Sequence, residues 1–363
     1  MFSQNEIAAV VSHFLLDGDF VSAEPIGSGH IHDTFRIALK REDKPACVIL
    51  QRINHEIFGN VPALMQNIQR VTAHLAGQSG DEPDADRHAL TLISTHDGKA
   101  WYFDANGQYW RVFREIPRTR TYDSVESPAQ AYQSAKSFGR FQYLLASLPA
   151  PRLNDTIPGF HHTPSRFAAL QKAIEADAIG RAAGCSLEIE FALAREALGH
   201  VLLDAGLPER VTHNDTKLNN VLFDSVTGEG ICVIDLDTVM PGLAPYDFGD
   251  MVRTTTCAAA EDERNLARVF MAFDLFEALI RGFLESAGGF LTRAEKLSLA
   301  HAGQLITFEQ GIRFLADHLR GDTYYKVHRE VLILSRCRAQ FCILASMEQQ
   351  MSRIEALVAL LAG

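Results

Sequence analysis

The stretch that most constrains this chain is residues 211–253, where clustered Asp and Asn residues lie beside strongly apolar runs. The apolar runs at 221–223 and 231–234 are separated by a segment that contains Gly228 and Gly230. Apolar, β-branched runs joined by a glycine-containing segment predict a hairpin of two short buried strands. The polar clusters are then expected at the strand ends, where the backbone is rigid and the side chains reach a cleft.

Three polar residues in this stretch have the spacing of a phosphoryl-transfer site. Asn220 follows Asp215 after five positions, and Asp235 follows it after twenty. Such a site needs a carboxylate near the attacking hydroxyl, and an amide oxygen and a second carboxylate that hold Mg²⁺ on the phosphates. The spacing therefore predicts Asp215 as the catalytic base and Asn220 and Asp235 as metal ligands. Lys217, two residues after the base, is predicted to offset charge on the transferring group.

A glycine motif near the N-terminus joins two predicted strands, at 21–25 and 33–39. Glycines allow backbone conformations and close approaches that side chains would block. A hairpin tip of this kind forms either a plain β-turn or a cover over nucleotide phosphates, whereas a dinucleotide-binding turn would lead into a helix. Together with the site at 215–235, the motif favours phosphate binding by Gly27, Ser28 and Gly29.

These motifs resemble a known group of enzymes. The string HNDTKLNNVLFD, followed by CVIDLDTVMPG, is similar to the catalytic core of the aminoglycoside phosphotransferase and choline kinase superfamily, relatives of the protein kinases. It looks closer still to the N-acetylhexosamine 1-kinase branch, as do IGSGHIHDTFRI, VILQRIN and FEQGIRFLADHLRGDTYYKV. The resemblance implies an α+β fold with two lobes, a small one with an antiparallel sheet and a large, mainly helical one.

The resemblance also implies where the lobes divide. We expect an N-terminal nucleotide-binding lobe at residues 1–116 and a C-terminal catalytic and acceptor-binding lobe at 117–363. In kinase-like folds the hinge between the lobes, here 115–118, hydrogen-bonds adenine through its backbone, which places Ile116 at the nucleotide. Arg111, shortly before the hinge, is predicted on the wet face of a strand.

One position departs from the family pattern. In the superfamily the strand corresponding to 47–53 usually carries a Lys that holds the α- and β-phosphates, and this strand has none. The equivalent is Gln51 or Arg52, or the role passes to Lys217. The departure also leaves open a protein that binds nucleotide without activity, although the intact Asp215 argues against it.

Two segments are predicted on the acceptor side. His30, His32 and Asp33 either cap a turn or face the acceptor, as similar blocks do in sugar 1-kinases. Glu309 and Arg313 lie four positions apart on one helix face. They form either an exposed ion pair or a site in which Arg313 binds sugar hydroxyls or an N-acyl carbonyl.

Further aspartates follow Asp235. Asp237 either caps a turn or assists a second metal. Asp247 and Asp250 are predicted as N-cap residues that hold the loop onto the next helix, with Arg253 available to pair with them. The D-F-G string at 247–249 is not expected to bind metal, because Asp235 already fills that position.

Composition limits the partners of the chain. The net charge of −11 and the lack of a polybasic run argue against nucleic acid and membrane surfaces. The six cysteines are far apart, which indicates free thiols in a reducing compartment. The first helix has no signal-peptide features, and no apolar run reaches the ~20 residues of a membrane span. We therefore expect a cytoplasmic protein.

The function expected from the motifs and the resemblance is that of an ATP- and Mg²⁺-dependent kinase. Its acceptor is expected to be a sugar hydroxyl, the anomeric hydroxyl of an N-acetylhexosamine. The alternatives are an aminoglycoside, a choline-like amino alcohol or homoserine as acceptor, or an inactive nucleotide-binding protein. The sequence does not assign an oligomeric state.

Overall fold

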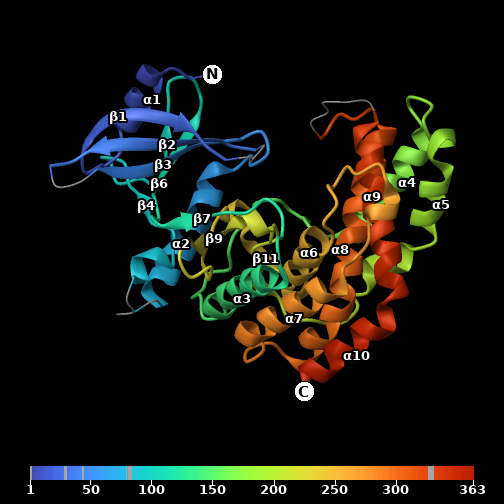
Figure 1. The fold of residues 1–363 in the computed structure, drawn as a ribbon. Helices are drawn as coiled ribbons and strands as arrows, with labels where there is room; N and C mark the ends of the chain where they lie inside the picture. The colour runs from blue at the N-terminus through green and yellow to red at the C-terminus, as the bar shows by residue number, and fades with distance from the viewer. Residues whose placement is uncertain (1, 28–30, 43–44, 79, 81–83, 326–330) are drawn as a thin grey trace.

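A computed structural model describes residues 2–27, 31–42, 45–78, 80, 84–325 and 331–363. The chain forms a sheet-containing part near its N-terminus and a larger, mainly helical part (Figure 1). The expected α+β, two-lobed, kinase-like fold is confirmed. The boundary predicted at residue 116 falls in the connection between β6 and β7 and stays a prediction.

The smaller part is built on an antiparallel sheet with the strand order β1-β2-β3-β6-β4, and β5 pairs with β6. Its strands are β1 (Asp19–Pro25), β2 (Asp33–Lys40), β3 (Ala46–Ile53), β4 (Leu92–Ile93), β5 (Tyr102–Phe103) and β6 (Tyr109–Arg114). Along β2 the side chains of Phe35, Ile37 and Leu39 are buried at alternate positions, because successive strand residues face opposite sides. Helix α1 (Gln4–Val11) covers this face of the sheet.

Helix α2 (Val61–Gln78) connects the sheet to the helical part. Its buried residues, among them Leu64 and Ile68, belong to the same hydrophobic core as α3 and α7. Its fully buried Asn67 donates from Nδ2 to the backbone oxygens of Asn154 (2.8 Å) and Val239 (3.1 Å). The two parts are therefore joined by packing as well as by the chain.

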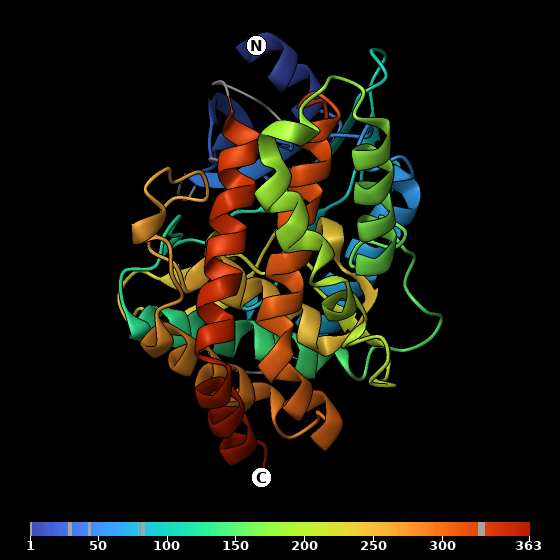
Figure 2. The ribbon, with the colours of Figure 1, turned by 90° about the vertical axis from the view of Figure 1, so that its right-hand side faces the viewer.

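The larger part contains most of the helices. They are α3 (Pro128–Leu145), α4 (Thr163–Ala176), α5 (Ser186–Leu193), α6 (Ala244–Thr255), α7 (Phe273–Ala287), α8 (Arg293–Leu319), α9 (Leu332–Gln349) and α10 (Met351–Ala362). The long helices α8 and α9 lie side by side, with α4 and α5 beside them (Figure 2). Ser127 caps α3, and Pro128 occupies its first turn.

Helix α5 ends after only two turns, at Leu193. The chain leaves α5 at Arg195, where φ is −120°, and continues as a 3-10 turn, η3 (Glu196–His200). The guanidinium of Arg195 lies over the ring of Phe191 and pairs with Glu348 of α9 at 2.8 Å. This tertiary pairing competes with continued helix, which sequence periodicity cannot show.

The predicted hairpin is confirmed as β9 (Val221–Asp224) and β10 (Gly230–Val233), which pair in antiparallel fashion. Strand β7 (Thr119–Arg120) extends this hairpin by pairing with β9. Strand β8 (Arg210–Thr212) precedes the first polar cluster and pairs with β11 (Met240–Gly242), which follows the second. The two pairings bring both polar clusters to the same region.

Two global properties are clear from the described residues. None of the helices described is both long and apolar enough to cross a membrane. All six cysteines lie in the described part, and each carries a free thiol.

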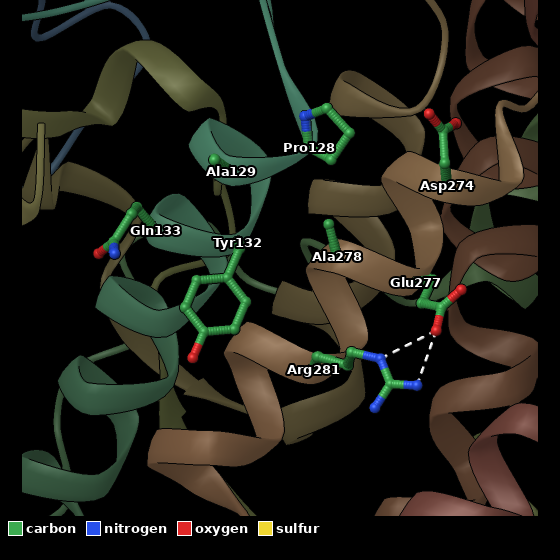
Figure 3. A pocket seen from close by; sticks show the side chains of 8 residues that line it. All are labelled: Pro128, Ala129, Tyr132, Gln133, Asp274, Glu277, Ala278 and Arg281. Carbon is green, nitrogen blue, oxygen red and sulfur yellow. Dashed lines mark hydrogen bonds and ion pairs between the residues drawn. The ribbon is translucent and has the colours of Figure 1, made fainter.

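A surface cavity of about 470 Å³ lies between α3 and α7 (Figure 3). Tyr132 and Gln133 line it from α3, and an ion pair between Glu277 and Arg281 lines it from α7. The described residues that line this cavity include none of the predicted site residues. The chemistry is therefore to be sought at the ends of the β9–β10 hairpin.

Candidate active site

The loop after β8 turns sharply just before Asp215. Asn214 has a φ of 66°, in the left-handed region that Asn adopts more readily than most residues. Its side chain holds the turn, since Nδ2 donates to the backbone oxygen of Thr238 (2.9 Å) and Oδ1 accepts from Oγ1 of Thr212 (3.0 Å). Asp215, the predicted base, is thus carried on a fixed backbone.

Helix α6 holds this loop through two buried carboxylates. Asp247 accepts the backbone N–H of His213 at Oδ2 (2.9 Å) and that of Asn214 at Oδ1 (2.7 Å). Asp250 accepts the backbone N–H of Thr216 at Oδ2 (2.8 Å). Three backbone N–H groups of the loop are therefore fixed by hydrogen bonds to carboxylates.

The prediction that Asp247 and Asp250 are N-cap residues is wrong. Helix α6 has Leu243 as its N-cap residue, so both aspartates lie within the helix and direct their carboxylates at the loop. The predicted pairing of Arg253 is confirmed. Its Nη2 lies 2.8 Å from Oδ1 of Asp250, and its Nη1 lies 3.0 Å from Oε1 of Glu261.

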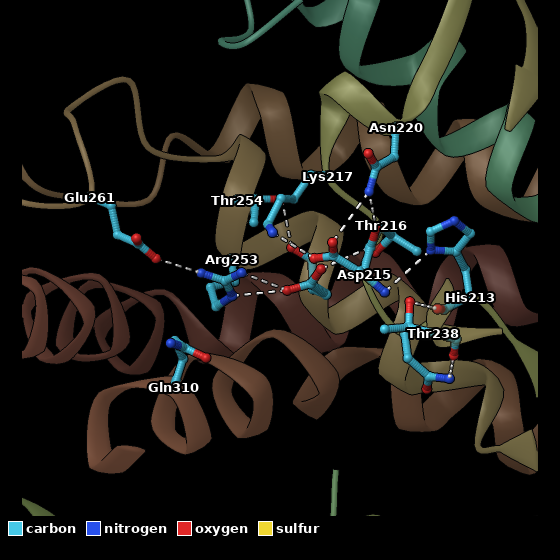
Figure 4. Close-up of polar contacts among 12 residues, drawn as sticks. His213, Asp215, Thr216, Lys217, Asn220, Thr238, Arg253, Thr254, Glu261 and Gln310 are labelled. Atoms are coloured by element: carbon cyan, nitrogen blue, oxygen red, sulfur yellow. Dashed lines mark hydrogen bonds and ion pairs between the residues drawn. The ribbon is translucent and has the colours of Figure 1, made fainter. Parts of the chain in front are cut away.

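The carboxylate of Asp215 lies at the centre of the site, with Lys217 and Asn220 pointing toward it (Figure 4). Nζ of Lys217 is 2.8 Å from Oδ1 of Asp215, and Nδ2 of Asn220 donates to the backbone oxygen of Asp215 at 2.8 Å. Burial acts to raise the pKa of Asp215, but the Lys217 ammonium outweighs it, and the pKa lies below its ordinary value. The side chain is 24% exposed, so this ionised carboxylate remains reachable from solvent.

Asp235 lies beyond the end of β10 and has a left-handed backbone, with φ 61° and ψ 58°. Its carboxylate makes no hydrogen bond or ion pair with the side chains described in the structure. Burial, followed by the charges of Asp237 and Asp215, raises the pKa of Asp235 to about 6. An acidic side chain that lacks a cation while near other carboxylates suits a divalent metal ion.

Asn220 offers the second ligand atom. Its Nδ2 is engaged by Asp215. Its Oδ1 is left without a donor among the described residues. An amide oxygen and a carboxylate are ligands that Mg²⁺ accepts, so the residues present fit the ion that the sequence predicts.

His32 and Asp237 lie beside Asp235, with potential ligand atoms of all three within 4.8 Å of one another. Nδ1 of His32 accepts the backbone N–H of Asn54 (3.0 Å), which assigns the ring proton to Nε2. Arg111 donates to both oxygens of Asp237, at 2.8 and 2.6 Å. Asp237 is thus paired with Arg111, whereas Asp235 is engaged by none of the described side chains. Whether Asp237 assists a second metal stays a prediction.

Arg111 is a site residue that sequence analysis placed wrongly. It was expected on a wet strand face, but its side chain is 1% exposed. It lies opposite Gln51 in the β3–β6 pairing, and its Nε donates to Oε1 of Gln51 at 2.9 Å. The only signal in the sequence is an arginine between Trp110 and Val112, and it does not indicate a partner.

Gln51 and Arg52 face opposite sides of the sheet. Gln51 faces Arg111, whereas Arg52 pairs with Asp33 at 2.5 Å and lies over the ring of Phe2 on the α1 side. The structure therefore does not bring Arg52 or Asp33 to the Asp215 cluster. His32, by contrast, approaches the cluster through Asp237, with Nε2 and Oδ1 separated by 3.4 Å.

The other nucleotide-side predictions are placed only in part. Gly27 has a φ of 85°, a backbone conformation that suits glycine. The backbone oxygen of the buried Ile116 accepts a hydrogen bond from Oγ1 of Thr119 at 2.9 Å. The remaining predicted residues of the glycine motif, Ser28, Gly29 and His30, lie outside the described residues.

Glu309 and Arg313 do not form the exposed ion pair that was one of their predicted roles. Glu309 is buried and lies 2.9 Å from Nδ1 of His161, which sequence analysis did not identify. Nε2 of His161 lies 3.2 Å from the backbone oxygen of Asn214, so α8 is tied to the loop that carries Asp215. Arg313 meets no carboxylate at ion-pair distance in the described part of the chain.

The direct contacts of Arg313 are instead with the neutral side chains of Gln310 and Phe160. Its Nη1 donates to Oε1 of Gln310 (3.1 Å), and its guanidinium lies 5.8 Å from the ring centroid of Phe160. Burial acts against its charge, but Tyr325 and Glu309 hold the pKa of Arg313 above its ordinary value. A charged guanidinium without an ionic partner suits a hydroxyl or carbonyl acceptor.

Comparisons with known proteins bear on the family and the fold. A family model described as "Phosphotransferase enzyme family" matches residues 22–282. The fold is similar to that of an aminoglycoside phosphotransferase from Alicyclobacillus acidocaldarius (TM-score 0.63, 15% identity, 97% of each chain covered). It is also similar to a microcompartment-associated aminopropanol kinase (TM-score 0.59, 16% identity, 97% of this chain and 99% of that one).

A third similar structure is a choline/ethanolamine kinase family protein from Mesorhizobium loti (TM-score 0.52, 17% identity, 94% of this chain and 93% of that one). At these identities the likeness concerns the fold alone. The acceptors that these proteins use are therefore not transferred to this chain.

Proposed function

Because the chain belongs to the phosphotransferase enzyme family, we propose that it is a small-molecule kinase acting on a sugar. The reaction transfers the γ-phosphoryl group of ATP to the anomeric hydroxyl of an N-acetylhexosamine. The observation that carries this proposal is the set of contacts that Lys217 and Asn220 make with Asp215. Asp235 lies near enough that the charge of Asp215 contributes to its raised pKa.

Asp215 positions the acceptor hydroxyl and accepts its proton. Its lowered pKa keeps the carboxylate ionised at neutral pH. An anomeric hydroxyl is more acidic than an ordinary alcohol, and the proton moves late in a loose transition state, so even a weakly basic carboxylate suffices. Catalysis then rests chiefly on positioning and on charge that is fixed before the reaction begins.

Lys217 provides the positive charge for the transferring phosphoryl group. The Asp215 carboxylate, opposed by burial, raises the pKa of Lys217, so its ammonium stays charged. Half of its side chain is exposed, and it is free to move from the base to the phosphate. Gln51, at the usual strand-Lys position, carries no charge.

Asp235 and Asn220 are the proposed Mg²⁺ ligands. When bound, the ion would neutralise phosphate charge and orient the γ-phosphoryl group. Asp237 is kept from the ion by Arg111. Gly27, Ser28 and Gly29 are proposed to cover the phosphates, and the backbone at Ile116 to meet adenine.

We expect protons to compete with Mg²⁺ for Asp235. Since the pKa of this carboxyl is raised to about 6, it is ionised above that pH and protonated below it. Mg²⁺ affinity of the ADP complex should be level above this pH and fall by about tenfold per unit below it, because ligands must be deprotonated. Calorimetric titrations at several pH values, corrected for protonation of ADP itself, measure this.

The variant Asp235→Asn is the control for this titration. It removes the titrating group, so Mg²⁺ should no longer strengthen ADP binding at any pH. A wild-type Mg²⁺ affinity that stays constant from neutral pH to well below the pKa of Asp235 would contradict the assignment of this residue as a ligand.

Arg313 supports a neutral, hydroxyl-rich acceptor over a cationic one. A second guanidinium, that of Arg166, lies near Arg313. Burial, and then repulsion from the charge of Arg313, lowers the pKa of Arg166. Both flank Phe160, since Nη2 of Arg166 donates to its backbone oxygen at 3.1 Å. Two such charges would repel choline or a polycationic aminoglycoside, but they suit hydroxyl and N-acyl oxygens.

An acceptor panel tests the proposed function most directly. Phosphorylation of N-acetylglucosamine, N-acetylgalactosamine, glucose, choline and kanamycin is compared in an ADP-coupled assay. The N-acetylhexosamines are expected to give the highest kcat/KM, with glucose weaker because it lacks the N-acyl carbonyl. A preference for choline or kanamycin would overturn the sugar assignment but keep the kinase.

Arg313→Ala is expected to raise the KM for the acceptor by about 10- to 100-fold, the range for losing hydrogen bonds from a charged donor. Affinity for ADP should not change, because Arg313 is proposed to touch only the acceptor. The control is Arg320→Ala, since Arg320 is exposed at the end of the same helix and donates to the backbone oxygen of Ala169. Equal KM values in the two variants would contradict the role of Arg313.

A further inference from the structure

We propose that Arg111 is a positioning residue: through Asp237 it fastens the small-lobe sheet to the turn that begins at the metal ligand Asp235. It would thereby fix where Asp235 stands relative to nucleotide phosphates. This inference rests on the proposed kinase function. Strand β3, which usually carries a Lys in the superfamily, has none in this chain. The link between the sheet and the site is instead made from β6, by Arg111 with Asp237.

The pairing of Arg111 with Asp237 is of the kind that fixes geometry. Their side chains are 1% and 3% exposed, and two parallel hydrogen bonds of 2.8 and 2.6 Å join them. A bidentate guanidinium–carboxylate contact fixes both distance and orientation. A buried ion pair is weak evidence for stability, and setting a unique arrangement is its better-attested use.

The guanidinium is also fixed on the side of the sheet. Its Nε donates to Oε1 of Gln51 at 2.9 Å, and Nε2 of Gln51 donates to Oγ1 of Thr34 at 3.2 Å. These contacts run from β6 through β3 to β2. Gln51 therefore orients Arg111 and does not hold phosphate, which gives the residue at the usual Lys position a defined role.

The turn that Asp237 belongs to starts with a strained residue. Asp235 has a positive φ, which a non-glycine residue keeps only when its surroundings hold it there. On one side Arg111 holds Asp237, and on the other the Oγ1 of Thr238 donates to the backbone oxygen of His213 at 2.7 Å. The turn is thus clamped between the small-lobe sheet and the loop that carries the base.

No other basic residue takes this place on β3. The one arginine in the strand, Arg52, lies on the opposite face with Asp33. Arg111 itself has both terminal nitrogens committed to Asp237, so it is not free to bind phosphate. Phosphate charge is therefore left to Lys217 and the metal, and Arg111 acts through Asp237.

The test uses the double variant Arg111→Met/Asp237→Leu. Replacing both members of a buried pair by apolar residues of similar size tends to preserve folding, whereas removing one strands the other charge. Urea unfolding, calorimetric ADP binding with and without Mg²⁺, and turnover are measured on the same preparations. We expect unfolding close to wild type, a 10- to 100-fold loss of the Mg²⁺-dependent gain in ADP affinity, and a similar fall in kcat, about the effect of losing a residue that orients a metal ligand.

Arg111→Lys and Arg87→Met complete the set. Arg111→Lys keeps the positive charge but lacks the two parallel N–H donors of the guanidinium. It should therefore keep part of the Mg²⁺-dependent gain in ADP affinity that the double variant loses. Arg87 forms another buried pair, with Asp224 of β9 at 2.7 Å, away from Asp235. Its loss should lower stability without changing the Mg²⁺ dependence.

The outcomes separate the inference from the proposed function. If the folded double variant keeps the wild-type gain from Mg²⁺, Arg111 is a packing residue and the inference is overturned. Wild-type protein that binds ADP equally well with and without Mg²⁺ would overturn the proposed function, and the inference with it.

Discussion

Asp215→Asn is expected to lower turnover by about 10²- to 10⁴-fold, the range for removing a positioned general base. Asparagine keeps the shape of the side chain but cannot take the acceptor proton or hold the Lys217 ammonium, now 2.8 Å from Oδ1. Affinity for ADP should remain close to wild type, because Asn220 and Asp235 are unchanged. An ADP-coupled assay and calorimetry measure the two quantities.

The matched control for this substitution is Asp204→Asn, at an exposed position shortly before β8. It carries the same change of charge and should leave both quantities unaltered. The assignment of the base fails if Asp215→Asn retains near wild-type turnover. A large loss of ADP affinity in that variant would instead show that the carboxylate serves the nucleotide.

Asp247→Asn is expected to lower the free energy of unfolding by about 3 kcal/mol or more, because a buried acceptor of several donors becomes partly a donor. Asp247 has no solvent exposure and accepts from two backbone N–H groups and from Nε2 of Gln142 at 2.6 Å. An asparagine amide would direct N–H groups at at least one of these donors. Urea unfolding measures the change.

Asp274→Asn is the control, since Asp274 lies exposed in the first turn of α7. Its replacement should change the free energy of unfolding by less than about 0.5 kcal/mol, as for most surface substitutions. If Asp247→Asn lowers the free energy of unfolding no more than this control does, the loop at His213 and Asn214 is held mainly by other contacts.

Local pattern was enough to predict the hairpin and the residues around it. The apolar runs of β9 and β10 have the strand signature, and the spacing of Asp215, Asn220 and Asp235 follows from which atoms a phosphoryl-transfer site needs. The structure brings Asn220 to Asp215 and places Asp235 within reach of its charge. The assignment of their catalytic roles stays a proposal.

The supporting contacts could not be predicted, because they join residues that are distant in sequence. Arg111 and Asp237 are 126 positions apart, and His161 and Glu309 are 148 apart. Arg52 shows a different limit: a shift of one position reverses the face of a strand residue. Whether Gln51 or Arg52 faced the large lobe depended on the register with β6.

The short contact between Lys217 and Asp215 has a consequence for the order of events. Lys217 occupies Oδ1 of Asp215, so an acceptor that approaches the proposed base would meet a carboxylate already paired with an ammonium. In the proposed mechanism, a bound triphosphate would offer Lys217 a stronger counter-charge and release Asp215. Nucleotide would then bind before sugar, and the resting protein would have no bare base with which to activate water.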